Sequence, residues 1–107
     1  MSWTRIYLPE AKEDLAKLDR PVQEEVLRGI RKVSQKPEYP NGYGKPLGNH
    51  RGSNLAGLYK IKLKKVGIRV VYALKREAEK MTIIVIAARA DDLVYREAER
   101  RRKKHGL

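Results

Sequence analysis

Three consecutive strand-like segments, residues 58–64, 68–75 and 81–88, constrain the fold of this chain most strongly. In the first, apolar and polar side chains alternate, and in the second Arg69 shares a face with Val71 and Ala73, as expected for strands with two different faces. The third is apolar on both faces, which predicts a central strand. Gly67 lies in the short first turn, and turns this short join antiparallel neighbours. The sequence therefore predicts an antiparallel sheet.

The segments before this sheet predict a short strand and two helices. Residues 3–8 alternate like a strand, and Pro9 suits the first position of a helix because proline lacks the N–H that would be unpaired there. Pro21 begins a second helix, whose apolar stripe continues until Pro37 ends it. The short connection predicts an antiparallel helical hairpin.

The end of the chain predicts a last helix that is nearly all charge. Asp91 or Asp92 can cap it, and it runs through Tyr95 to about Lys104. With so few apolar residues, this helix is expected to dock weakly and to be mobile or displaceable. The whole order, β-α-α-β-β-β-α, predicts an α+β fold: a small antiparallel sheet, an N-terminal helical hairpin packed on one face, and a C-terminal helix.

The segment from residue 36 to residue 56 is rich in proline and glycine and predicts a long structureless connection. Such a connection is either a functional loop or a flexible surface loop, and both readings stay open. It carries three residues that can contact an anion, Lys45, His50 and Arg51.

Length and composition favour one domain over residues 1–107 and a cytoplasmic location. The chain has no cysteine, which excludes disulfides and thiolate metal ligands. No apolar run approaches the roughly 18 residues of a membrane span, and the N-terminus lacks the pattern of a signal peptide. We therefore expect no contact with a membrane.

The formal net charge of +12 indicates a polyanionic partner. Nucleic acid is the commonest such partner, because each neutralised phosphate releases a counterion. The alternatives are a basic chain that is merely soluble, or one that an acidic partner protein covers.

Alternation places Lys60, Lys62 and Lys64 on one face of the first of the three strands. Arg69 begins the next strand, close across the turn, so the sheet is predicted to present a cationic surface. Alternatively, the lysines are ordinary solvated side chains on an exposed strand face and have no function in a site. Arg89 ends the most apolar strand, where its guanidinium must reach an edge or a cleft. Tyr95 follows six residues later, as a candidate site residue or a half-buried packing residue.

This set suits phosphate chemistry on RNA. It contains no carboxylate pair, no cysteine and no metal-ligand cluster, so we expect neither a metal nor another cofactor. His50 and His105 lie in a loop and a tail and are expected at the surface. Fixed cations stabilise charge on phosphate oxygens, and RNA supplies its own 2′-OH nucleophile. A tyrosine becomes a usable base when nearby cations favour the tyrosinate.

The chain resembles the RelE branch of the RelE/ParE toxin superfamily of type II toxin–antitoxin systems. The resemblance spans nearly the whole sequence and lies in five segments, residues 11–18, 57–63, 67–72, 85–89 and 94–98. The distance along the chain from Arg89 to Tyr95 also fits the family pattern.

The resemblance implies a ribosome-dependent endoribonuclease, an mRNA interferase that enters the ribosomal A site and cuts mRNA there without a metal. It carries the catalytic positions over to Lys60, Lys62, Arg69, Arg89 and Tyr95. By similarity, Tyr95 or a neighbouring lysine activates the 2′-OH, Arg69 stabilises the transition state and Arg89 assists the leaving oxygen. RNA-binding residues are expected at Lys45, Arg51 and Lys64.

The partners implied by the resemblance are the ribosome, mRNA and a RelB-like antitoxin that wraps the toxin and often displaces its last helix. The chain is then a monomer or part of a toxin–antitoxin hetero-oligomer. Ala87 and Ala88 depart from the family, in which bulkier or basic residues often precede the arginine. Two other functions stay open: a ParE-like toxin that poisons DNA gyrase, and a non-catalytic module that binds RNA or antitoxin.

Overall fold

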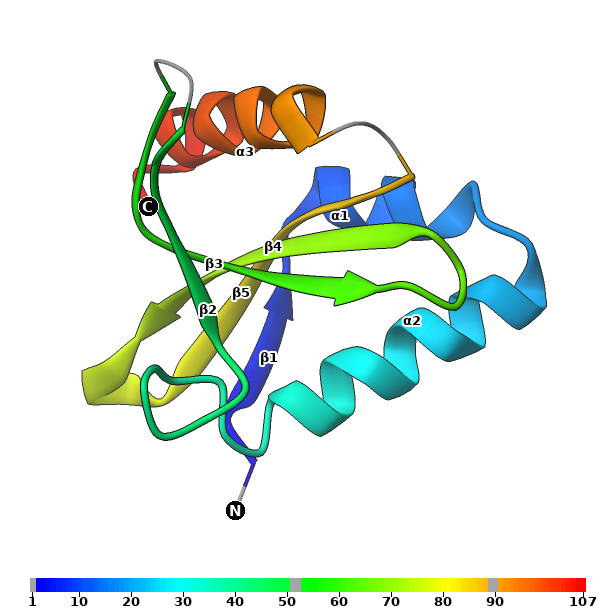
Figure 1. The fold of residues 1–107 in the computed structure, drawn as a ribbon, viewed down its shortest axis with the longest axis horizontal. Coiled ribbons are helices and arrows are strands. Elements are labelled where there is room, and N and C mark those ends of the chain that lie inside the picture. The colour runs from blue at the N-terminus through cyan, green and yellow to red at the C-terminus, as the bar shows by residue number, and fades with distance from the viewer. Residues whose placement is uncertain (1, 51–52, 89–90) are drawn as a thin grey trace.

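The computed structural model describes residues 2–50, 53–88 and 91–107. Five strands form one mixed sheet in the order β1-β5-β4-β3-β2, and three α-helices pack around it (Figure 1). The α+β class predicted from the sequence is confirmed. The elements are β1 (Thr4–Tyr7), α1 (Pro9–Ala16), α2 (Arg20–Val33), β2 (Lys45–His50), β3 (Ser53–Leu63), β4 (Ile68–Lys75), the 3-10 turn η1 (Arg76–Ala78), β5 (Lys80–Ala87) and α3 (Asp91–His105).

The three strands β3, β4 and β5 form the antiparallel meander that their alternation predicts. Gly67 turns β3 into β4 with a positive φ of 66°, which glycine adopts without strain. β5 is central, as its apolar pattern indicates, and Met81, Ile83 and Ile86 are buried in it. β1 pairs with β5 in parallel, so the sheet is mixed and not purely antiparallel.

The predicted structureless connection between residues 36 and 56 is wrong, because it contains the strand β2. This strand pairs antiparallel with β3, with a register shift between Pro46 and Gly48. Proline and glycine normally argue against a strand, but an edge strand tolerates both, since one side of its backbone needs no partner. β2 lies at the edge of the sheet, so the composition that hid it is compatible with its position.

α1 and α2 pack on the side of the sheet to which Leu63 of β3 points. α1 begins at Pro9, as predicted, and contacts β1 and β5. α2 begins one residue before Pro21 and packs against β3, where Leu63 lies directly against Gly29. The lysines of β3 alternate with Leu63 and belong to the opposite face of the strand, and they border a hollow that α2 also lines.

α3 lies across one end of the sheet and contacts β3, β4 and β5 (Figure 1). Its apolar contribution is small and consists of Val94, Tyr95 and Ala98, all buried. Ion pairs supplement this face: Arg101 contacts Asp14 of α1 at 2.7 Å, and Lys104 contacts Glu10 at 3.0 Å. No helix in the described part of the chain is long and apolar enough to cross a membrane.

Candidate functional site

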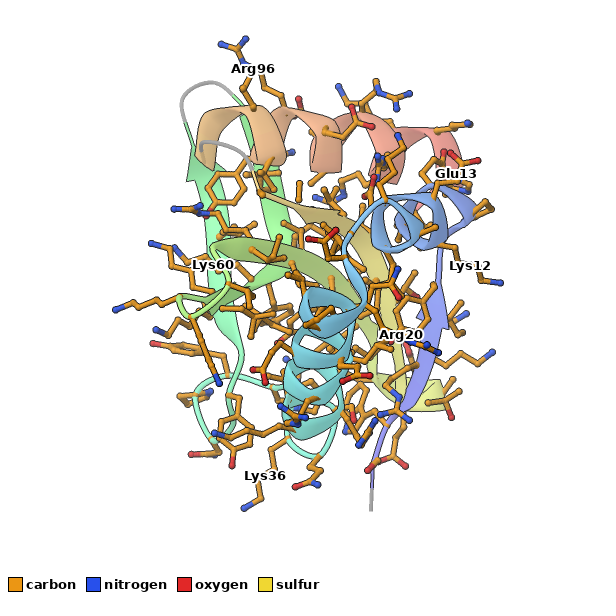
Figure 2. All side chains as sticks on the ribbon, turned by 90° about the vertical axis from the view of Figure 1, so that its right-hand side faces the viewer. Lys12, Glu13, Arg20, Lys36, Lys60 and Arg96 are labelled. Atoms are coloured by element: carbon orange, nitrogen blue, oxygen red, sulfur yellow. The ribbon has the colours of Figure 1, made fainter. Side chains whose placement is uncertain are left out.

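Cationic side chains from three strands lie on one face of the sheet. Arg69 of β4 is directly opposite Lys62 of β3, and Lys45 of β2 is directly opposite Lys60. Side chains of directly paired residues share a face, and their Cα atoms are about 5 Å apart. Lys60 and Lys62 share that face because they are two residues apart on one strand. The structure thus brings Lys45, Lys60, Lys62 and Arg69 together, and Lys60 points away from Arg20 and Lys12 (Figure 2).

Two adjacent hollows border this face. The smaller, of about 220 Å³, lies at the β3–β4 turn and is lined by Arg69 among others; we call it the arginine hollow. The larger, of about 480 Å³, lies between α2, the segment before β2, and the end of β3; we call it the tyrosine hollow, after Tyr43. Lys62 and Lys64 line both hollows, so the two adjoin at the end of β3.

The two hollows are strongly cationic. Five of the ten residues that line the tyrosine hollow are lysines, namely Lys32, Lys45, Lys60, Lys62 and Lys64. Among the described residues that line either hollow, none is acidic. Arg69 and Lys60 are half-buried and Lys62 is exposed, so the sheet partly covers the cluster while solvent can reach it. Such a surface binds phosphate groups.

Tyr95 occupies a different environment from the cationic cluster. Its side chain is 1% exposed and belongs to the apolar core, together with its neighbours Val94 and Ala98 on α3. The prediction from the sequence was either a site residue or a half-buried packing residue, and the ring is more buried than both alternatives imply. In this arrangement the phenol is not presented on the open surface of the two hollows.

Two predicted site residues, Arg51 and Arg89, lie outside the described residues. The strand that precedes Arg89, β5, ends at Ala87, whose partner on β4 is Arg69. Of the two histidines, His50 ends β2, and His105 contacts Glu10 at 3.0 Å. Within the described residues, no three His, Asp or Glu side chains gather as a metal site requires.

A buried ion pair joins α1, α3 and the edge of β5. Asp14 Oδ2 accepts hydrogen bonds from Arg101 Nη1 at 2.7 Å and from the backbone N–H of Ile86 at 3.0 Å. Arg101 Nη1 also donates to the carbonyl oxygen of Ile84 at 2.8 Å, and its Nε donates to Glu97 at 2.6 Å. β1 pairs with β5 only as far as Ile83, so these two side chains satisfy the backbone of β5 beyond that point.

Sequence reasoning missed this ion pair and also missed Tyr43. One signal was available for Arg101: it follows Val94 and Ala98 at helical spacing, so it continues the apolar stripe of α3. A charged residue on a buried stripe indicates a buried partner. For Tyr43 the sequence offers no comparable signal, because its surroundings depend on how the segment before β2 folds back on the sheet.

Two carboxyl groups, that of Glu10 beside the end of α3 and that of Glu97 within α3, have pKa values below the ordinary 4.5 of glutamate. The Lys104 ammonium, with a smaller contribution from His105, lowers the pKa of Glu10 to about 2. Hydrogen bonds from Arg100 and then Arg101 lower the pKa of Glu97. Because these pKa values are lower in the folded state, the pairs stabilise the protein fully above about pH 4.5, and the contribution is lost as the pH falls towards 2.

We therefore expect that acid weakens the folded state partly through α3. The free energy of unfolding of the wild type should fall between pH 5 and pH 3, and Glu10→Gln should show a smaller fall, because it has lost the titrating group. Denaturant titrations at the two pH values measure this difference. Glu13→Gln is the matched control, since Glu13 is exposed on the same helix (Figure 2). An equal fall in the wild type and Glu10→Gln would contradict the expectation.

The fold and the site define a small α+β protein with a cationic surface on one face of its sheet. Comparison with known proteins gives the family: residues 5–93 match the model of the ParE toxin of type II toxin–antitoxin system, parDE. The chain belongs to this toxin family, within the RelE/ParE superfamily, which confirms the superfamily resemblance in the sequence. No curated protein matches the chain.

Among solved structures, the chain is similar to RelE toxins. A doubly substituted E. coli RelE in the free state is 26% identical, with a TM-score of 0.72 over 94% of this chain and 98% of that one. The toxin–antitoxin complex RelBE2 from Mycobacterium tuberculosis gives 25% identity and a TM-score of 0.69 over 85% of this chain and 95% of the other. Isolated E. coli RelE is 25% identical, with a TM-score of 0.66 over 99% of this chain and 100% of that one.

Proposed function

We propose that this toxin is a ribosome-dependent endoribonuclease that cleaves mRNA in the ribosomal A site by attack of the RNA 2′-OH, without a metal. The observation that carries the proposal is the juxtaposition of Lys60, Lys62 and Arg69 on one open sheet face, bordered by hollows without acidic lining residues in the described chain. Similarity to RelE structures over nearly the whole chain supports the same reading.

Attack by the 2′-OH forms a bond to phosphorus, breaks the bond to the 5′ oxygen and leaves a 2′,3′-cyclic phosphate. The negative charge on the non-bridging oxygens grows in the transition state, and Arg69 stabilises it from a strand that packing holds in place. Lys60 and Lys62 bind the flanking phosphates or assist proton transfer.

The remaining roles are proton transfer and RNA binding. Arg89 assists the leaving oxygen, and Tyr95 or a neighbouring lysine takes the 2′-OH proton. Lys45, Lys64 and Arg51 bind RNA.

The burial of Tyr95 adds a requirement to this mechanism. A ring that is 1% exposed contacts a substrate only after its side chain or α3 moves. A shift of α3 has to break the Arg101–Asp14 pair and uncover the buried apolar face of the helix, so it needs a compensating source of energy. Binding to the ribosome would supply the energy for such a shift and would place the RNA in line for attack. Cleavage of free RNA should therefore be slow.

The proposed partners are the ribosome, mRNA and a RelB-like antitoxin. The M. tuberculosis neighbour was solved as a toxin–antitoxin complex, and the net charge of +12 favours acidic or nucleic-acid partners. The proposed location is the cytoplasm, where translating ribosomes are found. We treat residues 1–107 as one toxin domain, alone as a monomer or bound to the antitoxin as a hetero-oligomer.

A second candidate function is inhibition of DNA gyrase. The observation that favours it is the family model itself, which describes the ParE toxin of the parDE system. A cationic sheet face could bind an acidic surface of a protein target as well as RNA. Against this reading, this chain carries the combined set of lysines, arginines and Tyr95, which the gyrase inhibitors of the superfamily are expected to lack.

One experiment separates the two functions. Purified toxin is added to translating ribosomes with a defined mRNA, to the same RNA without ribosomes, and to a gyrase supercoiling assay. We expect cleavage at A-site codons within minutes, little cleavage of free RNA, and normal supercoiling. Intact mRNA on the ribosomes together with inhibited supercoiling would replace the RNase by the gyrase inhibitor. If neither assay responds, the binding-module reading is favoured and the proposed cleavage is wrong.

A further inference from the structure

We propose that the tyrosine hollow is a second RNA subsite, in which an unpaired base stacks on Tyr43 while the adjoining phosphates lie among the surrounding lysines. The inference rests on the proposed function, which brings a single RNA strand to the neighbouring arginine hollow. Lys62 and Lys64 line both hollows, so a strand that leaves the arginine hollow meets these two lysines where the tyrosine hollow adjoins it.

Hydrogen bonds within residues 36–44 hold Tyr43 in place. Its backbone N–H donates to the carbonyl oxygen of Lys36 at 2.7 Å, and the next N–H, of Gly44, donates to the carbonyl oxygen of Glu38 at 3.2 Å. The segment folds back on itself so closely that a Cβ on Gly42 would come within 2.3 Å of the Lys36 carbonyl oxygen. A backbone this tightly closed fixes the position from which the Tyr43 ring projects.

Two contacts tie the same segment to the sheet. The hydroxyl of Tyr72, a buried residue of β4, donates to the carbonyl oxygen of Pro37 at 2.8 Å. Arg76 forms an ion pair with Glu38 at the end of β4. The ring of Tyr43 is therefore placed by the sheet core and not by a free loop. A ring fixed before binding loses little conformational entropy when a base stacks on it.

The environment of the ring fits a nucleotide. Tyr43 is 46% exposed, so one part of its ring is open to a ligand. The Lys32 ammonium lies 5.1 Å from the centre of the ring, over one face. Lys45 and Lys60, paired across β2 and β3, line the same hollow. Base stacking on an aromatic ring, with cations for the phosphates beside it, is how proteins bind single strands without reading sequence.

A second exposed tyrosine on the same segment lacks this environment and provides the control. Tyr39 is 57% exposed but lines a different hollow, together with Trp3, Glu38 and Arg76. Only one lysine, Lys36, is among the described residues that line that hollow. If exposed tyrosines bind RNA nonspecifically, substitutions at Tyr39 and Tyr43 should weaken RNA binding equally. A stacking subsite predicts weaker binding for the substitution at Tyr43 alone.

The test measures binding of a labelled, fully 2′-O-methylated RNA hexamer by fluorescence anisotropy, without ribosomes. The missing 2′-OH prevents cleavage, so binding is separated from catalysis. We expect Tyr43→Leu to weaken binding about tenfold while the dependence of affinity on salt stays unchanged, because stacking neutralises no phosphate. Tyr39→Leu should bind like the wild type. Lys45→Ala should instead reduce the salt dependence.

Tyr43→Trp tests stacking directly and guards against a misfolded leucine variant. Tryptophan should keep the affinity, and its fluorescence should be quenched by the RNA but not by an abasic strand of the same length; the small change from buried Trp3 is subtracted using the wild type. Equal affinity of the wild type and Tyr43→Leu, equal effects at Tyr39, or equal binding of abasic RNA would each overturn the subsite. So would Tyr43-dependent binding of polyglutamate in place of RNA, which would make the hollow a protein-docking surface.

The outcomes distinguish this inference from the proposed function. Ribosome-dependent cleavage by a protein whose RNA binding ignores Tyr43 refutes the subsite and leaves the RNase intact. Tyr43-dependent RNA binding by a protein that never cleaves RNA on ribosomes supports the subsite and refutes the RNase.

Discussion

Arg69→Ala is expected to reduce the rate of mRNA cleavage on ribosomes by about 100- to 1,000-fold, the usual effect of removing one fixed donor to a developing oxyanion. Arg69 is half-buried on β4, directly opposite Lys62, and Val71, two residues further along the strand, is apolar and cannot replace the guanidinium. Cleavage of a defined mRNA by wild-type and variant toxin measures the ratio. The same variant should relieve growth arrest when expressed in cells.

Arg20→Ala is the matched control for Arg69→Ala. It removes an exposed arginine at the start of α2, on the far side of the molecule from Lys60 (Figure 2). The control should cleave mRNA at the wild-type rate, and both variants should show a cooperative unfolding transition. Tyr95→Phe keeps the buried ring and removes only the hydroxyl, so it should also relieve toxicity without unfolding. Full toxicity of both Arg69→Ala and Tyr95→Phe would refute the assigned site.

Asp14→Ala is expected to destabilise the protein by about 3 kcal/mol, within the range measured when one partner of a buried ion pair is removed. The side chains of Arg101 and Asp14 are only 9% and 16% exposed, so water cannot replace the lost carboxylate well. The substitution also removes the acceptor of the Ile86 N–H. Glu97 still contacts Arg101, which keeps the loss near the lower end of that range.

A denaturant titration measures this loss, and a double-mutant cycle with Arg101→Met isolates the pair. The double variant should lose less than the sum of the two single losses, because the second substitution no longer leaves a buried charge. Glu25→Ala, which breaks the exposed pair with Arg28, is the control and should cost less than about 1 kcal/mol. If Asp14→Ala costs no more than this control, the pair does not hold α3.

Local patterns predicted most of the fold. Alternation placed Lys60 and Lys62 on one face of β3, since side-chain direction in a strand depends only on residue number. Pro9 marked the first residue of α1 for an equally local reason, its missing N–H. The meander of β3, β4 and β5 followed from short turns. In each case the determining interaction lies within a few residues of the chain.

The parts that the sequence did not predict depend on residues far apart in the chain. β2 has the composition of a loop and becomes a strand because the edge of β3 offers hydrogen bonds to it. β1 pairs in parallel with β5, and the long connection between them permits either orientation, so no local pattern encodes the choice. Asp14 and Arg101, and likewise Tyr43 and Lys45, are neighbours only in the folded chain.

The sequence by itself determined the α+β class, the toxin superfamily, and the shared face of Lys60 and Lys62. Periodicity, turn residues and motif spacing are properties of nearby residues and can be read without a structure. The tertiary structure alone decided that Tyr95 is buried, that an ion pair fastens α3, and that Tyr43 stands beside the lysines. The physical reason is that burial and ion pairing depend on how segments far apart in the chain pack against one sheet.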